Sequence, residues 1–114
     1  MYEYSALILR VIDGDTVLAN VDLGFHIRRT MPLRLFGIDA PETQGVADRQ
    51  PGLAAAAYLG SLVAVKSVLI RTQLDKGDKY GRCLAEIFIP GEAESVNARM
   101  ISAGHAVAYD GGKR

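Results

Sequence analysis

The sequence has a single cysteine, no excess charge of either sign and no long apolar run. One cysteine, Cys83, excludes an internal disulfide. No apolar run approaches the roughly 20 residues that a membrane-spanning helix needs, so we expect no membrane partner. Thirteen basic residues balance thirteen acidic ones. This balance argues against charge-driven attachment of the whole domain to nucleic acid, although it permits a local binding site.

The first residues lack the basic start, long apolar run and small-residue cleavage site of a secretory signal. We therefore expect a cytoplasmic chain as the sequence stands, and secretion stays open if the chain is a processed product. Apolar residues make up 49% of the 114 positions, too many for a disordered chain. The length suits one domain with a modest core, and no internal repeat divides it. The sequence predicts a single domain over residues 1–114.

Short apolar segments separated by turn residues predict five strands. They are expected at residues 5–12, 16–21, 33–38, 67–71 and 82–89. The turn Asp13-Gly14-Asp15 should join the first two as a hairpin. Residues 22–31 are expected to form a loop, and Pro41 should end the third strand near Asp39, because proline cannot extend a ladder.

Helical spacing of apolar residues predicts a helix over 51–64, with Pro51 in its first turn. Ser95 is expected to cap a second helix over 96–103, and the tail from Tyr109 onwards is expected to fray. Five strands with a helix between the third and fourth predict a mainly β fold with α (α+β). We expect a five-stranded OB-like barrel with two helices, because closure of the sheet removes exposed edges.

The stretch Arg34-Leu35-Phe36-Gly37-Ile38-Asp39-Ala40-Pro41-Glu42 combines a strand with charged groups at its exit. Arg34 lies along the predicted strand, and Asp39 and Glu42 follow its end. A cation and two anions around a rigid strand end suit a metal ion and a phosphate. Taken alone, each group has a simpler interpretation: Arg34 could pair structurally with either carboxylate, and Arg82 could be a surface arginine.

Other polar groups favour structural roles. Asp13-Gly14-Asp15-Thr16 alone is most simply a hairpin turn, with Asp13 as a turn residue or a support for the site. His26 is expected in a loop, and His105 is expected to pack at a helix end.

Four stretches together carry a resemblance to a known family. They are Val11 to Val17, Arg34 to Glu42, Asp78 to Arg82 followed by Leu84-Ala85, and Val96-Asn97 through Gly104. In this order and spacing the chain resembles the staphylococcal nuclease (thermonuclease) family. The resemblance implies a calcium-dependent endonuclease on an OB-fold barrel. Such an enzyme cuts DNA and RNA with little sequence preference and leaves 3′-phosphates and 5′-hydroxyls.

The resemblance also implies roles for individual residues. The implied calcium ligands are the side chains of Asp15 and Asp39 and the backbone carbonyl of Ala40. The implied catalytic residues are Arg34 and Arg82, which would hold the scissile phosphate, and Glu42, which would orient or deprotonate the attacking water. The implied substrate contacts are Lys79, Tyr80 and Tyr109.

The chain departs from the best-known member of that family at several points. Ala40 replaces a threonine, only Tyr109 stands near the end where a second tyrosine is expected, and the sequence lacks the family's last helix. The loss of that helix removes core, so we expect a monomer with self-association possible. Two alternatives remain: a non-catalytic OB-type module that binds nucleic acid or protein, and a structural calcium-binding domain.

Overall fold

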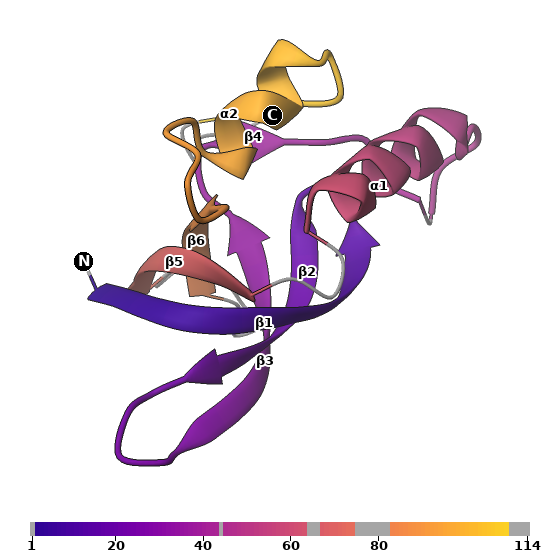
Figure 1. The fold of residues 1–114 in the computed structure, drawn as a ribbon. Helices are drawn as coiled ribbons and strands as arrows, with labels where there is room; N and C mark the ends of the chain where they lie inside the picture. Colours follow the sequence, from indigo (N-terminus) through magenta and orange to yellow (C-terminus); the bar gives the residue numbers. More distant parts are fainter. Residues whose placement is uncertain (1, 44, 64–66, 75–82, 110–114) are drawn as a thin grey trace.

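The computed structural model describes residues 2–43, 45–63, 67–74 and 83–109 of the chain (Figure 1). The strands are β1 (Tyr2–Asp13), β2 (Thr16–Asp22), β3 (Arg28–Leu35), β4 (Ile38–Asp39), β5 (Ser67–Leu74), β6 (Cys83–Phe88) and β7 (Val107–Ala108). The helices are α1 (Gln50–Val63) and α2 (Val96–Ser102).

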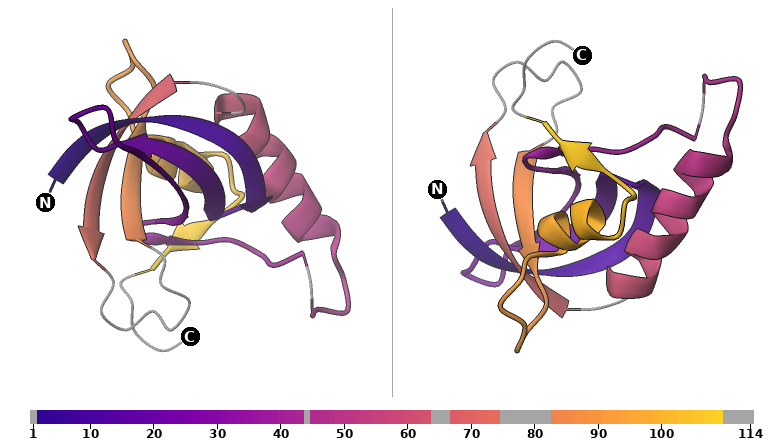
Figure 2. Two further views of the ribbon diagram at one scale, coloured as in Figure 1. Left: turned by 90° about the horizontal axis from the view of Figure 1, so that it is seen from below. Right: turned by 90° about the horizontal axis from the view of Figure 1, so that it is seen from above.

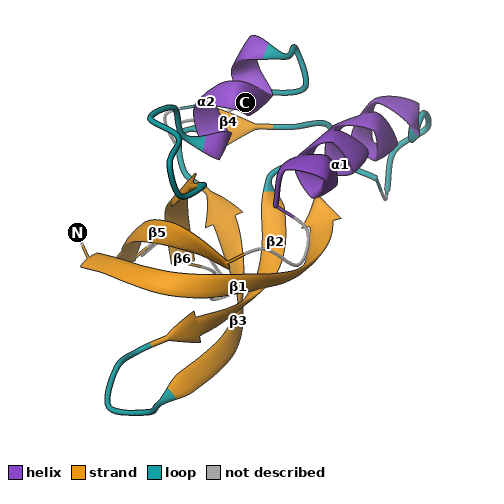
Figure 3. Cartoon of the chain, viewed as in Figure 1, coloured by secondary structure: helices purple, strands orange, loops and turns teal. Residues whose placement is uncertain are grey.

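Five of the strands close into a barrel in the order β1-β2-β3-β6-β5. Neighbouring strands are antiparallel except β3 and β6, which run parallel from Leu33 opposite Cys83 to Leu35 opposite Ala85. This confirms the predicted five-stranded OB-like barrel with two helices. Both helices lie at one end of the barrel, and the β2–β3 loop lies at the other (Figure 3).

The core fills the barrel from all five strands and continues under α1. Alternate residues of each strand point inward, as the pleat requires. The fully buried side chains include Ile8, Val17, Leu33, Ile70 and Ile87. The buried residues of α1 are Gly52, Ala55, Leu59 and Val63, which lie three or four positions apart and so share one face.

The predicted loop over 22–31 is confirmed at residues 23–27 and wrong at its two ends, because β2 extends to Asp22 and β3 begins at Arg28. Asp22 pairs with Arg28 and Val21 with Arg29, so both arginines belong to the ladder. This end of the hairpin is exposed, and its polar side chains resemble a loop in sequence although their backbone is extended.

The predicted continuous strand over 33–38 is also wrong. The chain turns at Phe36-Gly37, where Gly37 has φ +81°, and Ile38–Asp39 starts a separate strand. This β4 pairs with β7 near the end of the described chain (Figure 2). The Tyr109 backbone N–H donates to the Gly37 carbonyl at 2.8 Å. The prediction that the tail frays from Tyr109 onwards is therefore wrong for Tyr109 itself. Residues 110–114 lie outside the described part.

Helix α2 is tied to the barrel by a buried asparagine. Asn97 accepts from the Ile87 N–H at 3.1 Å and donates to the carbonyls of Phe36 at 2.8 Å and Ala85 at 3.0 Å. Ser95 caps the helix as predicted, accepting from the Ala98 N–H at 3.0 Å. The turn between β3 and β4 is thus fixed against both β6 and α2.

Candidate active site

Asp15 enters the site from the tight turn between β1 and β2. Its Oδ2 accepts from the Ala40 N–H at 3.0 Å, and its Oδ1 accepts from the Thr16 hydroxyl at 3.1 Å. The turn packs tightly on α1, because a Cβ at Gly14 would lie 2.6 Å from the Cβ of Ala55. Asp15 is buried, so its carboxylate is held by the fold against the segment that follows β4.

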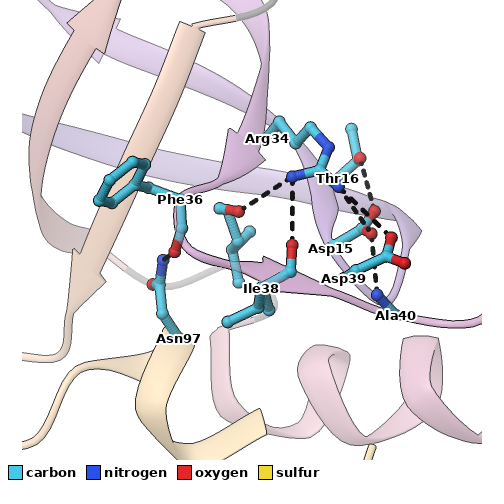
Figure 4. A network of polar contacts seen from close by, with 9 residues as sticks. Asp15, Thr16, Arg34, Phe36, Ile38, Asp39, Ala40 and Asn97 are labelled. Carbon is cyan, nitrogen blue, oxygen red and sulfur yellow. Dashed lines mark hydrogen bonds and ion pairs between the residues drawn. The ribbon is translucent and has the colours of Figure 1, made fainter. Parts of the chain in front are cut away.

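Arg34 joins two carboxylates that come from different parts of the chain. Its Nη2 lies 3.6 Å from Asp15 Oδ2 and 3.5 Å from Asp39 Oδ1 (Figure 4). Its Nη1 donates to the carbonyls of Ile38 at 3.2 Å and Leu35 at 3.4 Å. The side chain of Arg34 is only 10% exposed, so these attractions are screened less than those of a surface pair. The site therefore holds one guanidinium between two carboxylates in a fixed position.

Tyr109 lies close to the same guanidinium. Its ring centroid is 5.4 Å from Arg34 Cζ, within the range of a cation–π contact. The β4–β7 pairing brings this tyrosine to the site from the far end of the described chain.

Glu42 lines a cleft that begins at Asp39. The cleft has a volume of about 450 Å³. Its lining residues are Asp39, Ala40, Pro41, Glu42, Val46, Gly104, His105, Ala106 and Val107. The backbone of Glu42 passes close to α1, since a Cβ at Gly52 would lie 2.2 Å from the Glu42 carbonyl oxygen.

The segment after Glu42 is anchored on both sides. The Thr43 hydroxyl donates to Asp13 Oδ1 at 2.7 Å, and Arg49 Nε donates to the Thr43 carbonyl at 2.6 Å. Asp13 therefore supports the cleft through Thr43, in line with the expectation of a supporting residue. These contacts link the β1–β2 turn, the cleft and the start of α1.

The two histidines occupy the places that the sequence predicts. His105 follows α2 and stacks on Tyr58 of α1, with ring centroids 4.9 Å apart and planes at 27°. It also forms part of the cleft wall, which the sequence did not indicate. His26 is exposed in the β2–β3 loop.

The structure thus brings together Asp15, Arg34, Asp39 and Tyr109, with Glu42 in the adjoining cleft. The remaining predicted site residues, Lys79, Tyr80 and Arg82, lie outside the described residues. Within the described residues no group of three or more His, Cys, Asp and Glu side chains is arranged to hold a metal ion. The metal site that the family resemblance implies uses only two such side chains, those of Asp15 and Asp39, together with the backbone carbonyl of Ala40. It therefore does not need a group of three.

The family comparison covers most of the chain. Residues 32–114 match the model of the family described as "Staphylococcal nuclease homologue". The matched range contains Arg34, Asp39 and Glu42 but begins after Asp15.

Among the described residues, no helix has the length and apolar content to span a membrane.

Three relatives illustrate the similarity. "Endonuclease YhcR" of Bacillus subtilis (strain 168) is 30% identical over 115 residues, covering 94% of this chain and 9% of the relative. "Protein ParB" of Escherichia coli is 33% identical over 110 residues, covering 90% of this chain and 55% of the relative. "Thermonuclease" of Staphylococcus intermedius is 36% identical over 94 residues, covering 81% of this chain and 53% of the relative. The chain spans little more than half of the last two relatives and a small part of the first.

Proposed function

Because the chain belongs to the staphylococcal nuclease homologue family, we propose that it is a calcium-dependent nuclease that hydrolyses phosphodiester bonds in DNA and RNA. The observation that carries the proposal is the meeting of Asp15 and Asp39 at one nitrogen of Arg34, 3.6 and 3.5 Å away, at the edge of the cleft that Glu42 lines. A nuclease of this kind needs carboxylates for a metal, a guanidinium for the phosphate and a base near the attacking water.

The donor set fits a hard cation. Carboxylate oxygens of Asp15 and Asp39 already converge on one positively charged group, so their positions suit a shared positive charge. Calcium takes oxygen ligands and completes its shell with backbone carbonyls and waters. We infer that these two carboxylates and the Ala40 carbonyl hold the ion. Bound calcium would offset the charge of the phosphodiester and orient a water.

Arg34 supplies permanent positive charge for the phosphate. Its two carbonyl contacts, at 3.2 and 3.4 Å, fix the guanidinium plane before substrate arrives. A planar guanidinium can donate two parallel hydrogen bonds to phosphate oxygens, which a lysine ammonium cannot reproduce. These bonds strengthen as charge builds on the phosphoryl oxygens, and only such a gain in the transition state accelerates the reaction. We propose that Arg82 supplies the second guanidinium.

Glu42 is proposed to receive a proton from the attacking water or to orient that water. It lines the cleft next to Asp39, and the close approach of Gly52 fixes its backbone. As the water oxygen bonds to phosphorus, the bond from phosphorus to the 5′-oxygen would break and that oxygen would take up a proton from solvent, so the products would be a 3′-phosphate and a 5′-hydroxyl. Lys79 and Tyr80 are proposed to contact a neighbouring phosphate, and Tyr109 to line the nucleotide site beside Arg34.

The test is cleavage of single-stranded DNA, plasmid DNA and RNA by the purified protein, with calcium, magnesium and chelator in parallel. We expect cleavage with calcium and none with chelator. Glu42→Gln should lower the rate by about 100-fold or more, in the range for loss of a general base. Glu3→Gln is the matched control, because Glu3 is an exposed glutamate paired with Arg71 on the barrel surface.

Two outcomes would decide against a nuclease. If the protein binds nucleic acid without cleaving it, and calcium and chelator make no difference, the chain is a non-catalytic binding module. If calcium raises the melting temperature but no substrate is cut, the site is a structural calcium site. Equal rates for Glu42→Gln and the native protein would remove Glu42 from the reaction.

A further inference from the structure

The loop between β2 and β3 presents an aromatic side chain that the protein does not cover. We call Leu23–Ile27 the β2–β3 tip. Phe25 is 93% exposed, and Leu23 and Ile27 beside it are 39% and 56% exposed. The tip is well defined: Leu23 N–H donates to the Ile27 carbonyl and Ile27 N–H to the Gly24 carbonyl, each at 2.9 Å. The ring of Phe25 is therefore held out on a hydrogen-bonded support.

The backbone of the tip is strained in order to hold this ring. Gly24, Phe25 and His26 have φ values of +81°, +56° and +64°. Glycine adopts such angles freely, but a bulky side chain is disfavoured there, and hairpin turns of this kind favour Asn-Gly. Burial of the ring does not compensate the strain, because Phe25 is almost fully exposed. A strained, exposed aromatic residue is a reason to look for a ligand.

Charge at the base of the tip favours an anionic ligand. Asp22 is the one acidic residue in the stretch 22–29, and Arg28 pairs with it at 3.6 Å. Arg29 is exposed and makes no ion pair with any other described residue, which leaves one positive charge in excess. A cleft of about 440 Å³ lies beside the ring, lined by Asp22, Gly24, Phe25, His26 and Arg28. The cleft places Phe25 beside the guanidinium of Arg28, and an aromatic side chain next to positive charge is the combination that binds single-stranded nucleic acid.

The tip and the candidate active site lie on the same hairpin. Thr16 pairs with Arg34 at one end of the β2–β3 ladder, and Asp22 pairs with Arg28 at the other. The two pairs are six residue steps apart along the strands, which corresponds to roughly 20 Å. OB folds bind oligonucleotides along the face of their second and third strands. A strand leaving the active site along this face would reach the tip at the far end of the barrel (Figure 3).

We propose that the β2–β3 tip is an accessory binding site for single-stranded nucleic acid, in which Phe25 stacks on a base and Arg29 contacts a phosphate. The inference rests on the proposed nuclease function in that the bound strand is the substrate. The apolar residues of the tip would also suit an anionic membrane surface or a second copy of the chain. Two observations favour nucleic acid instead: the β2–β3 ladder connects the tip to the active site, and the cleft beside Phe25 contains Arg28.

The first test measures binding without cleavage. A labelled oligothymidylate of about 15 nucleotides, long enough for one OB fold, is titrated in chelator and followed by fluorescence anisotropy. Phe25→Ala should weaken binding about five- to tenfold, the low end expected for loss of one stacked base. Phe25→Tyr should bind like the native protein. Tyr2→Ala, which removes another exposed aromatic side chain (70% exposed), should have no effect.

The salt dependence of the same titration tests Arg29. Arg29→Ala should lower the slope of log affinity against log salt by about 0.7, the value for one phosphate of a single strand. Native binding by Phe25→Ala, or equal loss in Tyr2→Ala, would overturn the proposal. The proposal would also be overturned if Phe25→Ala left oligonucleotide binding unchanged but abolished binding to phosphatidylserine vesicles or dissociated a dimer of the protein.

The second test separates the tip from the catalytic site. The dinucleotide TpT has one scissile bond and is too short to span roughly 20 Å. Phe25→Ala should therefore lower kcat/KM about five- to tenfold for the longer oligonucleotide and leave kcat/KM for TpT unchanged. If the native protein cleaves neither substrate, the proposed function fails, and the anisotropy titration still decides whether the tip binds nucleic acid.

Discussion

Replacing Asn97 with alanine should destabilise the protein strongly, because this side chain makes three buried hydrogen bonds. Asn97 is 4% exposed and bonds to Ile87, Phe36 and Ala85. The Ala85 carbonyl would keep a donor, the Phe36 N–H at 2.8 Å. The Ile87 N–H would lose the asparagine acceptor, at a cost of about 1 to 3 kcal/mol. With the lost bond to Phe36 and the space left behind, we expect a total of about 3 kcal/mol.

The prediction is measured by urea and thermal unfolding. A loss of about 3 kcal/mol should lower the melting temperature by about 12 °C, taking about 4 °C per kcal/mol for a domain of this size. Asn20→Ala is the matched control. Asn20 also makes side-chain hydrogen bonds, to Thr30 and Arg28, but near the surface. Water can replace those bonds, so the control should change stability by less than about 0.5 kcal/mol.

A second variant tests the direction of the bonds. Asn97→Asp keeps an acceptor for the Ile87 N–H but removes the amide that donates to two carbonyls. It also places a carboxylate among buried acceptors, so it should be no more stable than Asn97→Ala. If Asn97→Ala loses less than about 1 kcal/mol, or no more than Asn20→Ala, the argument that this network fixes α2 and the β3–β4 turn is refuted.

Three further predictions concern the site itself. Gly52→Ala should lower the cleavage rate, because its Cβ would meet the Glu42 carbonyl oxygen at 2.2 Å, and steady-state kinetics should show the loss even where circular dichroism shows a folded protein. Arg34→Lys should lower kcat for DNA by about 10-fold or more, since lysine cannot form the bidentate contact with phosphate. The control Arg71→Lys, on the barrel surface, should leave kcat unchanged. An equal loss of kcat in both variants would contradict the role of Arg34. Calcium at about 100 times its dissociation constant should stabilise the native protein by about 2.7 kcal/mol in thermal unfolding but not stabilise Asp15→Asn to the same extent; equal stabilisation would place the ion elsewhere.

The barrel and the two helices could be predicted from the sequence because their signals are local. Alternation of apolar residues marks the inward face of a strand, and Ser95 marks a helix start within one residue of that observed. The grouping of Arg34 with Asp39 could be anticipated from the residues, because Asp39 stands where the predicted strand that carries Arg34 ends. The place of Asp15 beside them came only from the resemblance to the nuclease family, because Asp13-Gly14-Asp15-Thr16 alone predicts no more than a hairpin turn.

The errors fall where tertiary contacts decide the structure. Strands β4 and β7 have two residues each, too short for any periodic signal, and only the packing of the chain end beside Gly37 creates their pairing. The sequence predicts a loop at Arg28 because an exposed ladder lacks the apolar alternation of a buried one. From the sequence we assign no packing role to Asn97, although a polar residue between buried Val96 and Met100 on a short helix is the signal that points to one.

The central claim is that Asp15 and Asp39 share one ion beside Arg34, and the most direct test is the cleavage rate of single-stranded DNA measured as a function of calcium concentration. The native protein should show a rate that saturates with calcium and is abolished by chelator. Asp39→Asn should require much more calcium and reach a lower maximum. Cleavage that ignores chelator, or an Asp39→Asn curve that overlies the native one, would contradict the claim.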